Sequence, residues 1–400
     1  MTKCLLMFAM VIAALAIGGR VLADEFKVTP SISVKEDYND NVLYSVDNVQ
    51  HDFLTTLSPG LTFLNRTERM ELTINGGLDH RIYSKNTELN ATDQTCQGNI
   101  RYVFDPKNTF AAKAGYVQDS SADRDFETTG LPLTTLKRNR QTYGASWDYI
   151  FTEIAVASLS YDYGNDTYEG DRYSDLESHS AGIMFVRDLS YFAQSTKGRL
   201  HFGYSRYLQT NLSVENYSAT LGFSRDLSEK WSVMLDAGAR YTRSWFKVYQ
   251  YSPVPPFPLQ SSDERNRDRG GIGALALAYK GERTTGELSL SYDLAPASGR
   301  SGTAERTSAT LNINHRFTYE LKGGISAGYY KNKSQEGDFS TSSIDEELFR
   351  ISPSIRYEFN NDARLEASYN FSKTWYHVDH SQAERNLFSL RFYIQYDLIK

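Results

Sequence analysis

The clearest pattern in the chain is an alternation of apolar and polar side chains close to its C-terminus. In segment 387–398, one face would carry Phe388, Leu390, Phe392, Ile394, Tyr396 and Leu398. The opposite face would carry Ser389, Arg391, Tyr393, Gln395 and Asp397. A period of two belongs to a β-strand and not to a helix. A final strand with an aromatic and aliphatic outer face is typical of a transmembrane β-barrel.

The same alternation recurs along the rest of the chain, for example in segments 308–318, 348–359 and 364–372. In each of them apolar residues fall on alternate positions, and most of the residues between are serine, threonine, asparagine, arginine or glutamate. About 18 such segments can be counted, and an even number is usual in single-chain bacterial barrels. A barrel of this size encloses water, so we expect the polar face to point inward and the apolar face to meet lipid.

Short polar connections alternate with longer ones, and this rhythm predicts the two ends of the barrel. The longer connections are expected at 36–52, 119–139, 164–177, 247–269 and 332–347. Outer-membrane barrels have short periplasmic turns and long extracellular loops. The predicted fold is therefore an all-β, transmembrane antiparallel β-barrel of about 18 strands, closed by pairing of the last strand with segment 26–35.

The N-terminus predicts export from the cytoplasm. Lys3 precedes an apolar run over residues 5–17, and Ala23 ends a short stretch suited to signal-peptide cleavage. An uncleaved anchor helix is the alternative, but the run is shorter than the ~20 residues that a membrane span needs. We therefore predict a signal peptide at 1–23 and one barrel domain at 24–400. Cys96 would be the only cysteine left, so no internal disulfide is expected.

Composition agrees with a barrel in the outer membrane of a Gram-negative cell. The chain has 28 tyrosines and 21 phenylalanines, and aromatic residues line both interfaces of such barrels. The net charge of −6 argues against nucleic acid as a partner. We found no linker or shift in composition that would divide the chain into further domains.

The N-terminal part of the predicted barrel resembles a known family. The residues that carry the resemblance are Val28-Thr29-Pro30-Ser31-Ile32-Ser33-Val34, Glu36-Asp37-Tyr38-Asn39-Asp40-Asn41-Val42 and Phe53-Leu54-Thr55-Thr56-Leu57-Ser58-Pro59-Gly60-Leu61. They look like the β-barrel porin 2 family, whose genes often lie beside exopolysaccharide and capsule genes. The resemblance implies an outer-membrane barrel and, for some members, exopolysaccharide export. It implies no catalytic residues. The chain ends Leu398-Ile399-Lys400, whereas the commonest outer-membrane pattern ends on an aromatic residue.

Charged residues on the predicted inner face are the first candidate site. The lumen-lining candidates are Arg240, Arg316, Arg350, Arg356, Arg364, Glu366 and Arg391. Rings of basic residues attract anionic solutes in pores. Asp236, Glu358 and Asp397 share that face, so packing of the lumen by salt bridges is an equal alternative.

The connection rich in proline and aromatic residues at 249–258 is the second candidate. Its prolines favour a stiff, extended chain. Tyr249, Tyr251 and Phe257 could form a constriction at the mouth or stack on sugar rings, and an exposed loop tip is the alternative.

Catalytic, metal and cofactor sites are not predicted. No serine or cysteine nucleophile lies in a glycine-bounded turn near a histidine, so we do not expect an enzyme. His377 and His380 with Asp379 are read as a polar loop rather than as a metal site. The Asx-rich segments 36–41 and 162–166 offer oxygen ligands that would suit calcium, but they are read as hairpin ends at strand-loop junctions. Pro59 and Pro353 fall inside predicted strands, where each should mark a bulge or a misplaced boundary.

The leading hypothesis is therefore a passive conduit for exopolysaccharide through a polar lumen. Its partners would be outer-membrane lipid, the barrel-assembly machinery, the polysaccharide, and periplasmic and inner-membrane export components. A general or small-solute porin is the first alternative. A structural or adhesive barrel with a closed lumen is the second.

Overall fold

The computed structural model describes residues 25–121, 126, 131, 137–170, 173–251, 259–297, 302–337, 340 and 343–398, without the side chains of 248–251 and 259–262. The signal peptide predicted at 1–23 lies outside the described residues and stays a prediction. The strands are β1 (Glu25–Asn39), β2 (Asp52–Arg66), β3 (Met70–Tyr83), β4 (Ala91–Asp105), β5 (Asn108–Asp119), β6 (Arg138–Thr152), β7 (Ala155–Tyr168), β8 (Leu176–Asp188), β9 (Thr196–Gln209), β10 (Leu212–Asp226), β11 (Trp231–Tyr251), β12 (Leu259–Lys280), β13 (Thr284–Pro296), β14 (Thr303–Arg316), β15 (Leu321–Ser334), β16 (Ile344–Glu358), β17 (Ala363–Tyr376) and β18 (Ser381–Gln395). One 3₁₀ turn, Thr87–Leu89, lies between β3 and β4. No helix in the described part of the chain is long and apolar enough to cross a membrane.

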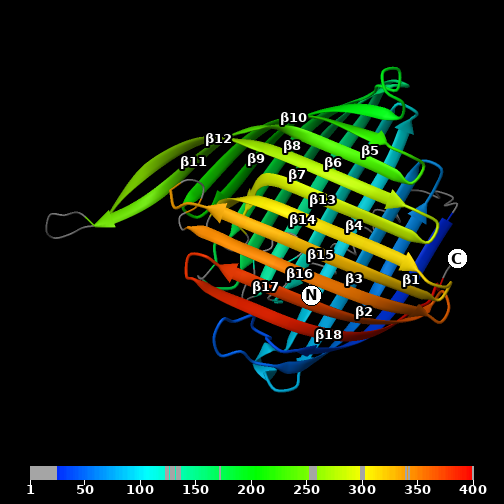
Figure 1. The fold of residues 1–400 in the computed structure, drawn as a ribbon, viewed down its shortest axis with the longest axis vertical. Helices are drawn as coiled ribbons and strands as arrows, with labels where there is room; N and C mark the ends of the chain where they lie inside the picture. Colours follow the sequence, from blue (N-terminus) through cyan, green and yellow to red (C-terminus); the bar gives the residue numbers. More distant parts are fainter. Residues whose placement is uncertain are drawn as a thin grey trace, which may run out of the picture.

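The 18 strands form a single closed antiparallel barrel (Figure 1). Each strand pairs with its neighbours in the sequence, and β1 also pairs with β18. In that closing pair Ser31 lies opposite Gln395 and Asn39 lies opposite Leu387. Closure satisfies the backbone groups that an open sheet would leave at its two edges. The predicted fold class, the number of strands and the closing pair are confirmed.

The two ends of the barrel differ in their connections, as predicted. At one end, called here the short-turn end, β4 and β5 are joined by residues 106–107 and β12 and β13 by residues 281–283. At the other, the long-loop end, β1 and β2 are separated by residues 40–51 and β5 and β6 by residues 120–137. Strand ends at the long-loop end extend further than the sequence predicted, so that several connections are shorter than expected.

The outer face of the wall is apolar over a band of membrane-like height. On β11 the outward residues run from Trp231 through Val233, Leu235, Ala237 and Ala239 to Tyr241. Ten residue steps of about 3.3 Å along a strand tilted by about 40° give a height of about 25 Å. That height equals the apolar band of a transmembrane barrel. Phe388, Leu390, Phe392 and Ile394 on β18 are likewise exposed on the outside.

Pro59 and Pro353 correct a prediction, because neither marks a bulge or a strand boundary. Each lies within a strand whose register is the same on both sides of the proline. Pairing with one neighbour is interrupted for two residues only, at Ser58–Pro59 against β3 and at Ser352–Pro353 against β17. A proline lacks the N–H that the ladder needs, and here the sheet tolerates the local loss because the other neighbour still pairs, as with Ile32 opposite Pro59.

Strands β11 and β12 differ most from the prediction. The predicted loop 247–269 is largely a hairpin, because β11 and β12 stay paired as far as Tyr251 and Leu259. β12 pairs with β13 only from Gly273 to Lys280. The first half of β12 therefore has β11 on one side and no strand on the other, and the hairpin extends away from the barrel (Figure 1).

Candidate functional site: a lumen narrowed at the long-loop end

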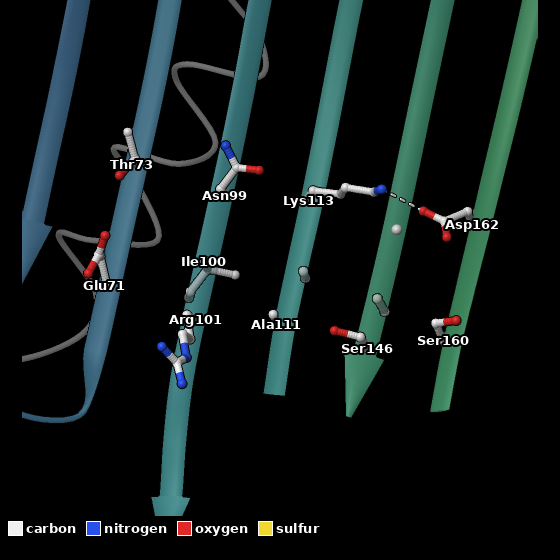
Figure 2. A pocket seen from close by; sticks show the side chains of 13 residues that line it. Glu71, Thr73, Asn99, Ile100, Arg101, Ala111, Lys113, Ser146, Ser160 and Asp162 are labelled. Carbon is white, nitrogen blue, oxygen red and sulfur yellow. Dashed lines mark ion pairs between the residues drawn. The ribbon is translucent and has the colours of Figure 1, made fainter. Parts of the chain in front are cut away.

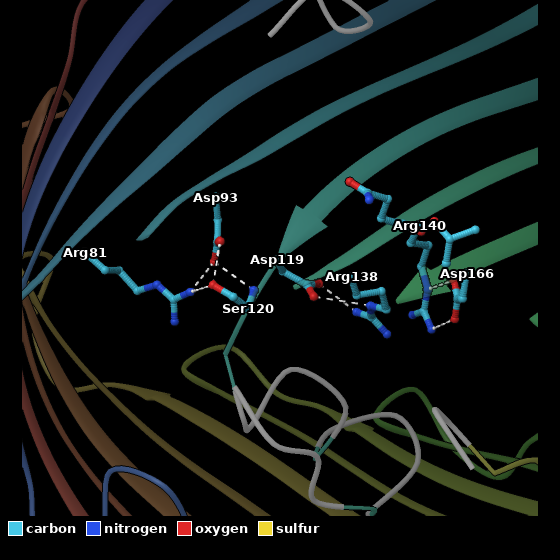
Figure 3. Close-up of polar contacts among 9 residues, drawn as sticks. Arg81, Asp93, Asp119, Ser120, Arg138, Arg140 and Asp166 are labelled. Atoms are coloured by element: carbon cyan, nitrogen blue, oxygen red, sulfur yellow. Dashed lines mark hydrogen bonds and ion pairs between the residues drawn. The ribbon is translucent and has the colours of Figure 1, made fainter. Parts of the chain in front are cut away.

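A row of arginine–aspartate pairs crosses the inner wall at the long-loop end (Figure 3). Arg81 of β3 contacts Asp93 of β4 at 2.6 Å between Nη2 and Oδ2. Next along the wall, Arg138 of β6 donates two hydrogen bonds to Asp119 of β5, at 3.2 and 2.7 Å. Such forked pairs fix both side chains in place, because the planar guanidinium matches the carboxylate.

The row continues onto β7 and is tied to the adjoining loop. Arg140 of β6 binds Asp166 of β7 through a second fork, at 2.7 and 2.5 Å. Ser120, just after β5, donates to Asp93 at 3.1 Å and receives a bond from Arg81 at 2.5 Å. Three arginines and three aspartates leave the row without net charge.

Most side chains of this row are buried, although they lie on the wall of a barrel. Arg138 exposes 3% of its side chain and its partner Asp119 exposes 15%. Ion pairs on a water-filled wall would be open to solvent, so other groups must cover them.

A largely aromatic cluster lies inside the barrel at the same end. Its buried members are Tyr44, Phe126, Tyr330, Leu348 and Ala383, with Tyr376 packed against them. Tyr44 comes from the connection between β1 and β2, and Phe126 from that between β5 and β6. Their rings meet edge to face with 4.8 Å between centroids. Two connections therefore each place an aromatic side chain inside the barrel. We call this group of buried residues, with Tyr376, the Tyr44 cluster.

Polar contacts hold the Tyr44 side of this cluster. The hydroxyl of Tyr44 lies 3.0 Å from Oγ1 of Thr374 on β17. Asn41 in the same connection donates to the carbonyl oxygens of Ser45 and Glu384, at 2.9 and 3.0 Å. The guanidinium of Arg385 lies over both aromatic rings, 5.5 Å from Tyr44 and 5.3 Å from Phe126. Burial raises the pKa of Tyr44 to about 12, so its hydroxyl stays protonated at neutral pH.

Arg240 lies close to the point at which β12 stops pairing with β13. Its side chain is fully buried and lies 2.9 Å from Asp268 of β12. It also forms an ion pair with Glu305 of β14 and donates to Thr242 at 2.9 Å. A buried charge needs such partners, because its desolvation is costly. Arg240, predicted to line the lumen, thus joins the unpaired half of β12 to the rest of the wall.

Below these packed groups, toward the short-turn end, the inner wall is open. A cavity of about 470 Å³ lies along β3 to β7 (Figure 2). Within it Lys113 and Asp162 form an ion pair of 2.8 Å with 60% and 47% of their side chains exposed. Gly144 lies beneath this pair, and a Cβ there would collide with the side chains of Lys113 and Asp162. The glycine lets the bridge cross β6.

A second open region of about 620 Å³ lies along β6 to β13. Serines and small residues line it together with Arg199 and Asp236, which form an ion pair of 3.4 Å. The middle of the barrel therefore holds polar space, whereas the long-loop end is packed.

The other predicted lumen residues lie on the inward face of their strands. Arg350 is buried and donates to Ser352 at 3.3 Å. Arg356 binds Glu366 at 2.6 Å, and Arg364 lies 4.0 Å above the ring of Tyr393. Their role in lining a transport path stays a prediction.

Two further predicted residues have weaker contacts. Arg316 lies over the ring of Tyr319 at 5.6 Å and donates to the carbonyl oxygen of Glu282 at 3.3 Å. Arg391 is exposed and lies opposite Glu366 in the register. Several of the predicted arginines are thus engaged with neighbouring carboxylates or aromatic rings.

The predicted mouth aromatics fall at the edge of the described chain. Tyr249 and Tyr251 belong to β11, in the part of the hairpin that extends away from the barrel (Figure 1). Their side chains and the whole of Phe257 lie outside the described residues. A role for these three residues at the mouth stays a prediction.

The oxygen-rich segments considered for calcium are engaged with the protein itself. Asp37 contacts Lys35 at 2.7 Å, and Asp40 accepts a hydrogen bond from Asn386 at 2.7 Å. Asp166 is held by Arg140, as described above. His377 lies 3.3 Å from Glu347. Within the described ranges, no group of three or more histidine, cysteine, aspartate or glutamate residues is arranged to hold a metal ion.

Sequence reasoning missed the groups that narrow the lumen. Arg81, Arg138 and Arg140 lie on the inward face of β3 and β6, so their position in the alternation could have found them. Tyr44 and Phe126 carry no such signal, because both belong to connections.

Comparisons with known proteins give likenesses of fold. No protein-family model and no curated protein matches the chain. Among solved structures, OccAB4 of Acinetobacter baumannii is 11% identical with a TM-score of 0.47, over 94% of this chain and 99% of that one. OccK2 (OpdF) of Pseudomonas aeruginosa is 9% identical with a TM-score of 0.47, over 94% and 99%. The outer membrane protein OpdK of Pseudomonas aeruginosa is 9% identical with a TM-score of 0.46, over 92% and 99%. Likenesses at this level assign no activity to this chain.

Proposed function

We propose that this chain is an outer-membrane channel that passes small polar solutes through a lumen narrowed at its long-loop end. The observation that carries the proposal is the contrast inside the barrel. Open polar space surrounds the exposed Lys113–Asp162 pair, and packed side chains lie at the long-loop end. A water-filled section followed by a narrow one is the arrangement of a selective pore.

The location in the outer membrane is part of the proposal. Its support is the closed barrel, in which the strands pair on both sides except along the first half of β12, and the outward apolar band of about 25 Å. The short turns would then face the periplasm and the long loops the outside.

Exopolysaccharide export, which the family resemblance implied, stays a prediction with less support. A polymer would need a continuous wide path. The Tyr44 cluster and the arginine–aspartate row occupy the lumen at one level of the barrel. Two connections would have to leave the interior before a polysaccharide chain could pass.

Conductance of the full chain in planar bilayers tests the proposal. We expect a small, steady conductance, and swelling of channel-containing liposomes in monosaccharides but not in long oligosaccharides. The double variant Tyr44→Ala/Phe126→Ala should raise the conductance several-fold, because both rings are buried inside the barrel. The matched control is Val49→Ala/Tyr191→Ala, whose side chains are exposed in connections.

The outcomes separate the three candidate functions. A correctly folded wild-type barrel without conductance would favour a structural barrel with a closed lumen. Passage of long oligosaccharides through the wild-type barrel would favour polymer export. An equal rise in the control variant would refute the role given to the Tyr44 cluster.

A further inference from the structure

Exposed arginines gather on the outer face of β9 to β12, at the long-loop end. They are Arg206, Arg243, Arg265, Arg267 and Arg269, called here the outer arginine cluster. All five are exposed. The chain as a whole has a net charge of −6, so this concentration of positive charge runs against the balance of the protein.

Strand register brings these arginines together. Arg243 of β11 lies directly opposite Arg267 of β12, and Arg265 and Arg269 lie two positions to either side on β12. Like charges directly opposite each other on one face of a sheet are destabilising. The arrangement therefore destabilises the isolated protein, and a bound anion would relieve the repulsion between the arginines.

On this face the protein supplies two carboxylates, Glu215 of β10 and Asp263 of β12, against the five arginines. Glu215 of β10 lies opposite both Arg206 and Arg243 and is 4.0 Å from Arg206. Within the part of the chain that the structure describes, Arg265, Arg267 and Arg269 form no ion pair. They also lie along the half of β12 that has no β13 partner, so ligand can approach from that side.

The height of the cluster indicates the kind of anion. Tyr204, Tyr217 and Tyr241 form an aromatic row on β9 to β11, with ring centroids 5.1 and 6.5 Å apart. Aromatic belts mark the boundary between hydrocarbon and headgroups. Arg243 comes two residues after Tyr241, 5.2 Å above its ring. The arginines thus stand just outside the apolar band, where lipid headgroups lie.

We propose that the outer arginine cluster is a binding site for phosphate groups of lipid headgroups in the outer leaflet. Arginine suits this ligand because its fork of N–H groups matches phosphate oxygens. Acyl chains of the same lipid would lie along the outward apolar residues of β11, below the tyrosine row. The proposal rests on the outer-membrane location in the proposed function, but it does not require an open lumen.

Binding to nanodiscs of phosphatidylcholine, with and without diphosphoryl lipid A, tests this site, with native mass spectrometry to count bound lipid. The variant Arg265→Gln/Arg267→Gln/Arg269→Gln should bind lipid A at least about tenfold more weakly, because charge-assisted contacts are lost. The control Arg69→Gln/Arg225→Gln/Arg283→Gln removes the same charge from exposed arginines at the short-turn end and should bind as the wild type does. Unchanged lipid binding in the first variant, or equal loss in the control, would overturn the proposal.

A charge reversal sharpens the test against misfolding. Arg267→Glu would place a carboxylate opposite Arg243 and replace a repulsion with an attraction. We expect a higher melting temperature in detergent without lipid A, together with weaker lipid A binding. A lower melting temperature would contradict the claim that the arginines repel one another when no anion is bound. Inorganic phosphate that competes fully with lipid A would instead assign the site to a soluble phosphate solute. Conductance measured on the same variants keeps this site separate from the proposed channel, since loss of one need not change the other.

Discussion

Two ion pairs on the same stretch of wall have opposite surroundings. Arg138–Asp119 joins β6 to β5 with side chains 3% and 15% exposed, whereas Lys113–Asp162, between β5 and β7, is 60% and 47% exposed. Both pairs point inward from neighbouring strands and differ mainly in height along the barrel. The wall alone therefore does not decide whether an inward charge is buried. The surroundings differ with height: buried clusters lie at the long-loop end, whereas an open cavity surrounds the exposed pair.

The difference also separates what each pair does. A buried pair is strongly coupled to folding, because removing one partner leaves the other charged and desolvated. An exposed pair contributes little to stability and remains free to act on a passing solute. The two pairs thus divide into a structural group and a candidate solute-contacting group.

Removal of the buried arginine should have the largest effect. Arg138→Ala leaves Asp119 without its forked partner, beside Asp93 of the same row. We expect a loss of about 3–5 kcal/mol in the free energy of unfolding, measured by urea unfolding in detergent. The double variant Arg138→Ala/Asp119→Ala should recover part of the loss. Wild-type stability in the single variant would show that the row is not effectively buried.

The second largest effect on stability should come from ionisation of Tyr44 at alkaline pH. Its pKa is about 12 in the folded protein and about 10 in an unfolded chain. A raised pKa means that the neutral phenol stabilises the folded state fully below pH ~10, and that this contribution is lost as pH rises toward ~12. This difference in pKa between the folded and the unfolded state corresponds to about 2–3 kcal/mol in the free energy of unfolding.

The comparison protein for this pH effect is Tyr44→Phe, which cannot ionise at that position. Between pH ~9 and ~12 the wild type should lose about 2–3 kcal/mol more stability than the variant. Parallel pH profiles of the two proteins would show that Tyr44 is open to solvent, and the Tyr44 cluster would then not narrow the lumen.

The exposed pair should give the smallest change in stability. Lys113→Ala is expected to alter the free energy of unfolding by about 0–1 kcal/mol, because the bridge is open to solvent. It should nevertheless shift the cation-to-anion permeability ratio toward cations, since Asp162 then loses its positive partner in the cavity. A large loss of stability with unchanged permeability would reverse the roles that we assign to the two pairs.

Much of the barrel could be predicted from the sequence, for a simple reason. Alternation of period two reports the two faces of a strand directly, so the strands, their faces and the closing pair of β1 with β18 followed from local patterns. The first half of β12 escaped because Asp263-Glu264-Arg265-Asn266-Arg267-Asp268-Arg269 is polar on both faces. Its strand character comes from pairing with β11, which no local pattern reveals.

The narrowed lumen was less predictable than the wall. The burial of Tyr44 depends on Thr374 and Leu348, which lie far away in the sequence. The predicted lumen arginines were on the correct face, but whether each is paired depends on the neighbouring strand. Arg356 lies directly opposite Glu366 on the neighbouring strand, whereas Arg364 lies over an aromatic ring.

The pairing of β1 with β18 has a consequence for the order in which the barrel is built. Thr29 donates a hydrogen bond to Asp397, 368 positions later in the chain. Every other neighbouring pair of strands is consecutive in the sequence and can form as a local hairpin. β1 and β18 can pair only after all the strands between them are in place. Contacts between such distant residues form late and slowly. Until then both edges are exposed and can pair with other chains. Assembly of this protein therefore has one hazardous last step, and a factor that shields the two open edges would govern its yield.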